Sequence, residues 1–261
     1  ISMAKEASLT GQPHLAQIAG IFSQRRRWLT FGAVIVGLLL AAGVLYFALG
    51  RPVQVLPRGQ AVPAFDMVDQ NGTAYRFPDR ALPVNVYVVA AAWDTRAADA
   101  IVPLLHELDS LVAERGWQEL VHVAWITPDP ERDDVAAMRA LAERLPLPER
   151  LDVAMLTGAP VTTRLVVGGG FGIYVGTPQA AGDGQPGFGL DDARAQALAV
   201  VYEPAMVVVD EIGYVRARYG VRNLSKARLA RDLGLLVKEA QAEGASRLIY
   251  ETAHLFMCYP R

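Results

Sequence analysis

The sequence predicts an α/β protein in which a single N-terminal transmembrane helix precedes an α/β sandwich domain. An uncharged apolar run covers residues 28–49, near the start of the chain. Further along, apolar runs typical of buried strands alternate with apolar residues at helical spacing, the order that an α/β sandwich requires. The chain has 261 residues, of which 52% are hydrophobic, which is enough for one sizeable core.

Residues 28–49 read WLTFGAVIVGLLLAAGVLYFAL and contain no charged side chain. At about 1.5 Å per residue, this run is long enough to cross a hydrocarbon core of roughly 30 Å. A cleaved signal peptide would have a shorter apolar run. Because the arginines at 25–27 directly precede the run, we expect residues 1–27 to form a cytoplasmic N-terminal tail. The sequence therefore predicts a single-pass protein of the cytoplasmic (inner) membrane with its C-terminal domain on the periplasmic or outer side.

The rest of the chain divides by composition into three parts. Residues 50–60 are rich in proline and glycine, which is typical of a linker. Residues 61–243 carry the strand and helix patterns of one domain. Residues 244–261 form an apolar C-terminal tail, because apolar pairs recur there at a spacing of seven residues: Leu248 and Ile249, then Leu255 and Phe256.

Local patterns predict the elements of the domain in order. Asn71-Gly72 is the strongest hairpin signal. We expect Asp129 to cap a helix that begins at Pro130 and ends near Leu145, with residues 131–133 as its solvated first turn. The other predicted elements are a buried strand at 84–93, a helix ending near Gly116, a buried strand at 120–127, an edge strand at 151–158, a short helix at 160–167 stopped by the glycines 168–170, two strands in 206–219 joined at 211–213, and a last helix from Ser225.

Composition and motifs exclude several classes of function. A formal net charge of -2 does not support nucleic-acid binding. The single cysteine, Cys258, excludes an intrachain disulfide and a Cys–Cys metal site. The glycines at 168–176 follow a predicted helix and match no phosphate-binding spacing, so we expect no nucleotide-binding site there. We expect no small-molecule substrate for the chain.

Several stretches together resemble the Sco/SenC family, the membrane-anchored thioredoxin-fold copper chaperones of cytochrome oxidase assembly. The resemblance covers roughly residues 60–240 and implies a thioredoxin-like domain in 61–243. The run Asp-Pro-Glu-Arg-Asp at 129–133 is its most specific part. The stretches that carry the resemblance are PAFDMVDQNG, AAAWDTRAADAIVPLL, WITPDPERDD, and VVVDEIGYV with the helix after it.

The family's metal ligands do not carry over to this chain. By the resemblance, a Cys-x-x-x-Cys pair falls on Asp94 and Ala98, and a distant histidine falls about on Tyr202. A thioredoxin-type Cys-x-x-Cys pair would fall on Asp94 and Ala97, while Pro204 matches the position of the cis-proline beside such sites. Thiol exchange requires a thiolate, and Cu(I) prefers sulfur ligands. We therefore predict no catalytic, cofactor-binding or metal-binding residue at this place, and no cofactor.

The C-terminal tail leaves a second interpretation open. His254, Met257 and Cys258 are soft-ligand types within five residues, so they could form a replacement copper site. The alternative is packing, in which the tail is a short apolar helix that docks on a partner subunit or on the domain's own flank.

The leading functional hypothesis is a non-catalytic accessory subunit of a respiratory or photosynthetic electron-transport complex, such as an alternative complex III or a cytochrome oxidase. Its partners would be other subunits of that integral membrane complex and the lipid bilayer. The contacts would come from the tail or from the Gly- and Pro-rich loop at 178–192. The alternative hypothesis is a divergent copper chaperone or assembly factor for cytochrome oxidase.

Overall fold

The computed structural model of the chain describes residues 13–50, 53–176, 200–221 and 224–257. The chain divides into two compact units, Ile1–Pro52 and Val53–Arg261. The boundary between the units lies within residues 50–60, the predicted linker. Each unit has its own architecture.

The N-terminal unit is one long helix, α1 (Pro13–Gly50). Its segment Trp28–Tyr46 has a mean hydropathy of 2.3, and every side chain in the segment is exposed. An exposed apolar helix of this length suits the hydrocarbon core of a bilayer, so it indicates a single-pass membrane anchor. The helix also includes residues 13–27, predicted as a tail, because no proline interrupts the chain after Pro13 until Pro52.

The C-terminal unit is built on a five-stranded mixed sheet with the strand order β5-β4-β3-β8-β9. Strands β3, β4 and β5 are parallel, whereas β8 pairs antiparallel with both β3 and β9. The predicted strands are confirmed, and β5 lies at the sheet edge as predicted. The bounds are β3 (Val84–Val89), β4 (Val121–Ile126), β5 (Val153–Leu156), β8 (Ala205–Asp210) and β9 (Val215–Gly220).

Two smaller strand pairs accompany this sheet. β1 (Phe65–Val68) and β2 (Ala74–Phe77) form an antiparallel hairpin, and Gly72 in its turn has a φ of 78°. Glycine reaches positive φ without steric cost, which is why Asn-Gly favours a tight turn. The predicted hairpin is therefore confirmed, and Gly72 has the backbone conformation on which the prediction rests. β6 (Val175–Gly176) and β7 (Val201–Tyr202) form the second pair. The predicted surface loop at 178–192 lies outside the described residues.

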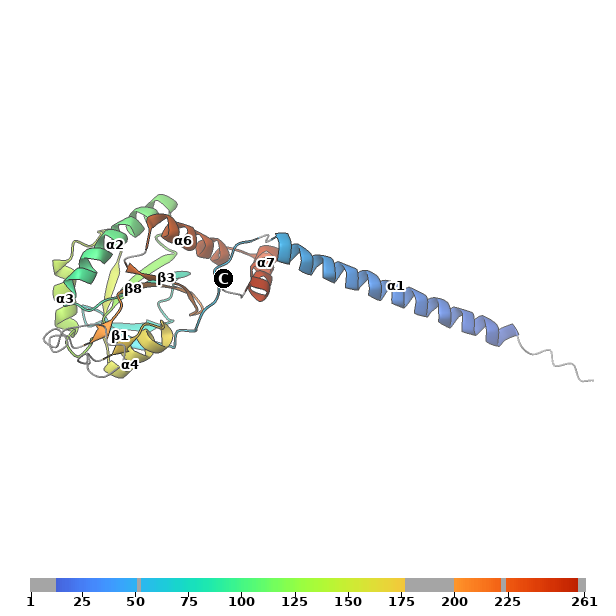
Figure 1. Ribbon diagram of the computed structural model, residues 1–261, viewed down its shortest axis with the longest axis horizontal. Coiled ribbons are helices and arrows are strands. Elements are labelled where there is room, and N and C mark those ends of the chain that lie inside the picture. The colour runs from blue at the N-terminus through green and yellow to red at the C-terminus, as the bar shows by residue number, and fades with distance from the viewer. Residues whose placement is uncertain (1–12, 51–52, 177–199, 222–223, 258–261) are drawn as a thin grey trace, which may run out of the picture. The chain divides into compact units, whose positions relative to one another are not determined.

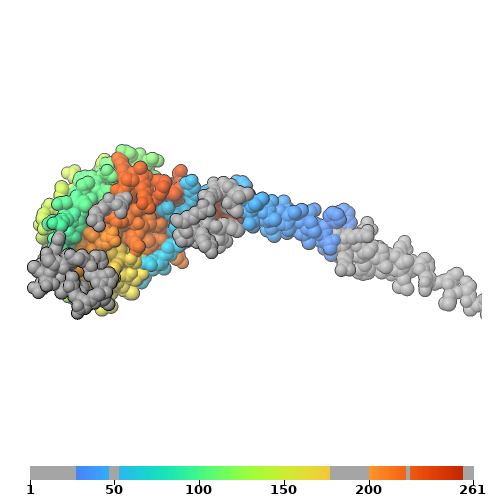
Figure 2. Space-filling view, in the orientation of Figure 1, coloured from blue at the N-terminus to red at the C-terminus, as the bar shows by residue number. Residues whose placement is uncertain are grey.

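Helices α2, α3 and α6 lie on one face of the sheet, while the β1–β2 hairpin and α4 lie on the other (Figure 1). α2 and α6 pack against each other, and their atoms form a continuous surface in the space-filling view (Figure 2). The sheet is therefore covered on both faces, as an α/β sandwich requires. The bounds are α2 (Thr95–Arg115), α3 (Val135–Arg144), α4 (Pro160–Arg164) with its continuation η1 (Leu165–Gly170), α6 (Lys226–Ala240) and α7 (Gly244–Met257).

Strand β3 is the centre of both core layers. Its alternate residues Val86 and Val88 pack toward α2 and α6, whereas Tyr87 and Val89 pack toward the hairpin, and all are fully buried. This confirms a strand covered on both faces. The strand ends at Val89 rather than near residue 93, because the backbone N–H groups of Ala91 and Ala92 donate to the side chains of Tyr202 and Asp133.

Two predicted helix boundaries are confirmed. Gly116 ends α2 in the left-handed conformation, with a φ of 67°. The Ser225 hydroxyl caps α6 by accepting a hydrogen bond from the backbone N–H of Arg228.

The start of α3 differs from the prediction. Asp134, rather than Asp129, is the N-cap residue, and its Oδ1 accepts from the backbone N–H of Ala137 at 2.8 Å. The apolar periodicity of α3 begins at Val135, and an N-cap residue directly precedes the first periodic residue. Asp129 is thereby available for a different contact.

The glycines at 168–170 do not stop a helix as predicted. They continue α4 as a wider helical turn, η1, in which the N–H of Phe171 donates to the carbonyl of Val166 at 2.8 Å. A Cβ atom on Gly170 would lie 3.0 Å from the Pro63 side chain. Any other residue here would press against Pro63, so glycine suits the close approach of these two chain segments.

Candidate functional site

The junction between β3 and α2 is the place at which the sequence predicts a lost metal site. Asp94 is the N-cap residue of α2, and its Oδ1 accepts a hydrogen bond from the backbone N–H of Ala97 at 3.0 Å. Ala97 and Ala98 lie in the first turn, and both are buried. The positions that match the family's cysteines therefore offer one carboxylate and two buried methyl groups.

Tyr202, at the end of β7, meets this junction from a distant part of the chain. Its hydroxyl donates to Asp94 Oδ2 at 2.8 Å and accepts from the backbone N–H of Ala91 at 2.9 Å. Burial raises the pKa of Tyr202, and the Asp94 carboxylate raises it further, so the phenol keeps its proton at neutral pH. Both oxygens of Asp94 are thus bonded within the domain.

Asp133 holds the same loop from another direction. Its Oδ2 accepts from the backbone N–H of Ala92 at 2.7 Å and from the hydroxyl of Thr127 at 2.5 Å. The pKa of the Asp133 carboxyl is raised above its ordinary value, because burial raises it by more than the hydrogen bonds from Thr127 and Ala92 lower it. At 2% exposure, Asp133 is buried, which corrects the prediction of a solvated side chain for this residue. Glu131 and Arg132 are exposed as predicted, but they precede α3, which begins at Val135.

Asp129 contacts Trp93 instead of capping a helix. The indole Nε1 of Trp93 donates to Asp129 Oδ2 at 3.0 Å, and Asp129 is buried. The Trp93 ring meets the Tyr202 ring edge-on, with 6.3 Å between the ring centres. The first and last residues of the Asp-Pro-Glu-Arg-Asp run therefore both fix the loop that follows β3.

Pro204 lies between Tyr202 and β8, as the matched cis-proline position requires. The peptide bond before Pro204 is trans, and within the described residues the cis bond is Phe77–Pro78. The position is therefore kept, but the isomer expected there is not.

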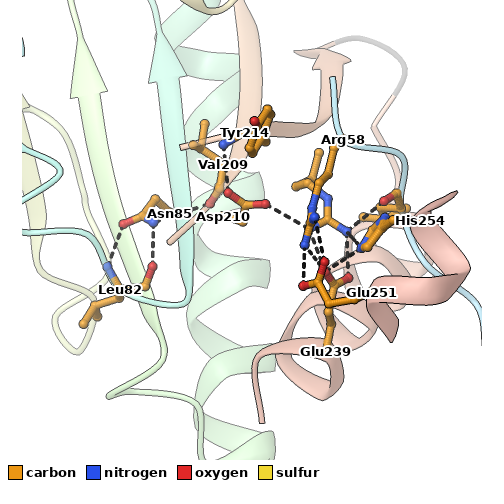
Figure 3. A network of polar contacts seen from close by, with 11 residues as sticks. Arg58, Leu82, Asn85, Val209, Asp210, Tyr214, Glu239, Glu251 and His254 are labelled. Atoms are coloured by element: carbon orange, nitrogen blue, oxygen red, sulfur yellow. Dashed lines mark hydrogen bonds and ion pairs between the residues drawn. The ribbon is translucent and has the colours of Figure 1, made fainter. Parts of the chain in front are cut away.

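Of the candidate ligands in the C-terminal tail, the structure describes the side chain of His254. His254, on α7, is buried within a network of charged side chains near the end of α6 (Figure 3). Its Nε2 lies 2.8 Å from Glu239 Oε1, and because a carboxylate only accepts, Nε2 carries the hydrogen and donates. Met257 is the last residue of α7, and Cys258 lies outside the described residues.

Arg216, on β9, is the centre of this network. Its guanidinium donates to Asp210 Oδ2 at 2.9 Å and to both oxygens of Glu239 at 3.0 and 2.7 Å. It also donates to the backbone carbonyl of Leu56 at 2.8 Å. Burial acts to raise the pKa of Glu239, but the hydrogen bonds and charges of His254 and Arg216 lower it to about 2. Glu239 is therefore ionised at neutral pH.

Arg58 and Glu251 extend the network to the segment that precedes the domain. Two guanidinium nitrogens of Arg58 donate to the two oxygens of Glu251 at 3.0 and 2.9 Å, a bidentate pair. Helix α7 is thus held at Glu251 and at His254, and Ala253 between them is buried. One face of α7 docks on the domain's own flank, which is one of the two coverings expected for the tail.

No family model matches the chain, and no curated protein matches its sequence. Solved structures of Sco proteins resemble its fold. Arabidopsis thaliana ScoI with copper bound matches with a TM-score of 0.52 at 15% identity, over 69% of this chain and 99% of that one. Yeast Sco1 matches with a TM-score of 0.53 at 18% identity, over 68% and 98%. BsSco, described as a member of the Sco family of cytochrome c oxidase assembly proteins, matches with a TM-score of 0.53 at 14% identity, over 71% and 98%.

The chain has a Sco-like thioredoxin fold. The predicted fold class is thereby confirmed, including the N-terminal apolar helix and the central mixed sheet. At such low identity, the likeness establishes the fold, whereas activity depends on the residues of the site.

Asp94, Ala98 and Tyr202 meet at one place in this Sco-like fold. Beyond the Tyr202–Asp94 bond, the backbone N–H of Ala98 donates to the carbonyl of Asp94 at 3.0 Å. The side chains offer a carboxylate and a phenol, whereas Cu(I) prefers thiolate, thioether and imidazole ligands. These residues do not fit a Cu(I) site. Across the described ranges, no group of three or more His, Cys, Asp or Glu residues is arranged to hold a metal ion.

Tyr202→Phe is expected to destabilise the domain by about 1–3 kcal/mol. The change removes the donor to Asp94 and leaves the N–H of Ala91 without its acceptor. Thermal unfolding of the full chain in detergent, followed by tryptophan fluorescence, measures the loss. Tyr214→Phe is the matched control, because the structure gives its hydroxyl no hydrogen bond to a described residue. If both variants unfold at the wild-type temperature, the bond to Asp94 does not stabilise the junction.

Sequence reasoning missed the roles of Asp133 and Asp129 in the loop after β3. A usable signal was present, since the periodic apolar residues of α3 begin at Val135 and point to Asp134 as the cap. With Asp134 as the cap, the two earlier aspartates need other partners. Nothing in the local sequence identifies those partners as Ala92 and Trp93.

Proposed function

We propose that this chain is a non-catalytic, membrane-anchored accessory subunit of a bioenergetic membrane complex. The complex is a respiratory or photosynthetic electron-transport assembly, such as an alternative complex III or a cytochrome oxidase. The Sco-like domain serves protein contacts, with the N-terminus in the cytoplasm and the domain on the periplasmic or outer side. Its partners are other subunits of the complex and the lipid bilayer.

The hydrogen bond between Tyr202 and Asp94 is the observation that carries this proposal. It lies where the family resemblance sets the metal ligands, and it uses groups that would otherwise be open to a ligand. A carboxylate and a protonated phenol that bind each other cannot carry out thiol exchange, which requires a thiolate. The chain keeps the fold, while the residues at the matched site bind one another. This combination supports reuse of the scaffold for protein contacts.

The choice of a bioenergetic complex rests on similarity. One of the matched structures is named for cytochrome c oxidase assembly, and the apolar helix Trp28–Tyr46 suits a protein that works at a membrane.

Gentle detergent extraction of native membranes, with this chain as bait, tests the proposal. We expect the chain to copurify at constant ratio with haem- or iron–sulfur-bearing subunits and to run at the size of that complex. After separation from its partners, the full chain is expected to hold no stoichiometric copper. Recovery as a free monomer with bound copper would overturn the proposal.

The alternative is a divergent copper chaperone or assembly factor. It is favoured by the match to ScoI with copper bound and to a member of a family of assembly proteins. This alternative requires stoichiometric copper that is lost in His254→Ala and in Cys258→Ser but kept in His106→Ala. His106 serves as the control because it is exposed and contacts the carbonyl of Pro146, far from the tail in sequence.

A further inference from the structure

Helix α7 has two unlike faces. The inner face carries Ala253 and His254, which are 2% and 5% exposed. Leu248 and Ile249 are 69% and 38% exposed. A helix with 3.6 residues per turn rotates by about 100° per residue. Leu248 therefore lies about 120° from His254 around the helix axis in one direction, and Ile249 lies about 140° from His254 in the opposite direction. The face that begins with these two residues is called the outer face of α7.

The sequence repeats the apolar pair of this face further along the helix. Leu255 and Phe256 follow Leu248 and Ile249 at a spacing of seven residues, which is close to two helical turns. A helix with a polar, docked face and an apolar, uncovered face has the pattern of a helix that lies in the plane of a membrane interface. A single exposed leucine would need no explanation, but two adjacent exposed apolar side chains on a helix with a docked face do.

The length of the connecting chain limits how far this end of the domain can be from a membrane. Leu56 follows Tyr46, the last residue of the apolar segment, by ten residues. Because α1 remains helical to Gly50, the chain from Tyr46 to Leu56 can reach at most about 27 Å. Leu56 is already fixed to the domain, since its carbonyl accepts from Arg216.

Helix α7 is attached next to this tether point. Arg58, two residues after Leu56, forms the bidentate pair with Glu251 of α7. Arg216 binds both Leu56 and Glu239, and Glu239 accepts from His254 of α7. The end of the domain that is tethered to the apolar segment is therefore the end that carries α7.

We propose that the outer face of α7 lies in the interfacial region of the lipid bilayer, with Leu248 and Ile249 among the lipid chains. The ionic contacts at Arg58 and Glu239 hold the inner face against the domain, so the apolar face points away from it. The domain is then attached to the membrane at two places, the span and α7. This inference holds whether or not the chain is a subunit of an electron-transport complex.

Site-specific fluorescence in the full chain tests the proposal. In a Cys258→Ser background, Leu248→Cys is labelled with an environment-sensitive nitrobenzoxadiazole dye and reconstituted in phosphatidylcholine–phosphatidylglycerol vesicles. Val161→Cys on α4, where the native side chain is 75% exposed, is the matched control. Two quenchers are compared, a lipid with a nitroxide on its acyl chain and aqueous iodide. Because Leu248 is exposed, the substitution preserves the core, and Ile249→Cys repeats the measurement at the neighbouring position.

We expect the label at 248 to emit at shorter wavelength than the label at 161 and to lose most of its emission to the nitroxide lipid. Iodide is expected to quench only the label at 161. Iodide quenching at both 248 and 249 would overturn the proposal. A blue-shifted label that the nitroxide lipid does not quench would also overturn it, because a protein surface such as a second copy would then cover the outer face.

Discussion

Arg216→Ala is expected to lower the free energy of unfolding of the domain by about 3–5 kcal/mol. The Arg216 side chain is 1% exposed and pairs with Asp210 and Glu239, whose side chains are 9% and 12% exposed. Its removal leaves two carboxylates with little access to water and without their main counter-charge. The Leu56 carbonyl also loses its donor. Urea unfolding of the full chain in detergent, followed by tryptophan fluorescence, measures the difference.

Arg76→Ala is the control for this change. Arg76 also belongs to a strand and also forms an ion pair, with Asp66 at 2.6 Å, but both side chains are largely exposed. Exposed pairs contribute about 0–1 kcal/mol, so this variant is expected to unfold almost as the wild type does. Equal losses in the two variants would contradict the argument, since the network around Arg216 would then be no stronger than a surface pair.

The strands and helices of the core follow from local patterns in the sequence. β3 is a short β-branched run without alternation, and a strand buried on both faces needs that composition. α2 ends at Gly116 and α6 begins after Ser225, because the physics of helix ends acts within a few residues. In these places sequence neighbours determine the outcome, so the sequence is sufficient to predict it.

The buried charges could not be predicted in the same way. Arg216 follows Val215 in a strand whose burial alternates in part, and such alternation predicts a solvated polar side chain. It is buried because α6 and α7 return to cover it, with Glu239 and His254 as partners. Those contacts join residues that are far apart in sequence, and no local spacing encodes them.

The arrangement of residues at the junction between β3 and α2 was predicted in part. The resemblance placed Asp94, Ala98 and Tyr202 at equivalent positions, and the structure joins Tyr202 to Asp94, with Ala98 one turn further along α2. The hydrogen bonds that fill the junction were not foreseen, because Tyr202 and Asp94 are 108 positions apart in the sequence. A residue with no counterpart in a family motif has a role that only its spatial neighbours reveal.

The triple variant Asp94→Cys, Ala98→Cys, Tyr202→His is expected to bind about one Cu(I) per chain, where the parent chain binds none at this place. Positions 94 and 98 are four residues apart at the start of α2, so their side chains lie on one side of the helix. The Tyr202 side chain already reaches position 94. Two thiolates and an imidazole are the soft ligands that the present residues lack, and a helix N-terminus favours the thiolate form of cysteine. Copper is quantified after anaerobic loading in the presence of a competing chelator.

A Cys258→Ser background removes the tail thiol, so any bound copper can be assigned to the junction. The control is Asp94→Ser, Ala98→Ser, Tyr202→His, which keeps the imidazole and similar side-chain sizes but has no sulfur. Loss of the Asp94 cap costs about 1 kcal/mol, and loss of the Tyr202 hydrogen bonds costs about 1–3 kcal/mol. The sum is below the roughly 5–15 kcal/mol by which domains are stable, so both variants are expected to fold, which circular dichroism checks. If the folded cysteine variant holds no more copper than the serine variant, the three positions do not converge as a ligand set. Stoichiometric copper in the cysteine variant alone would show that the scaffold still positions a metal site and that residue identity at three positions keeps the metal out.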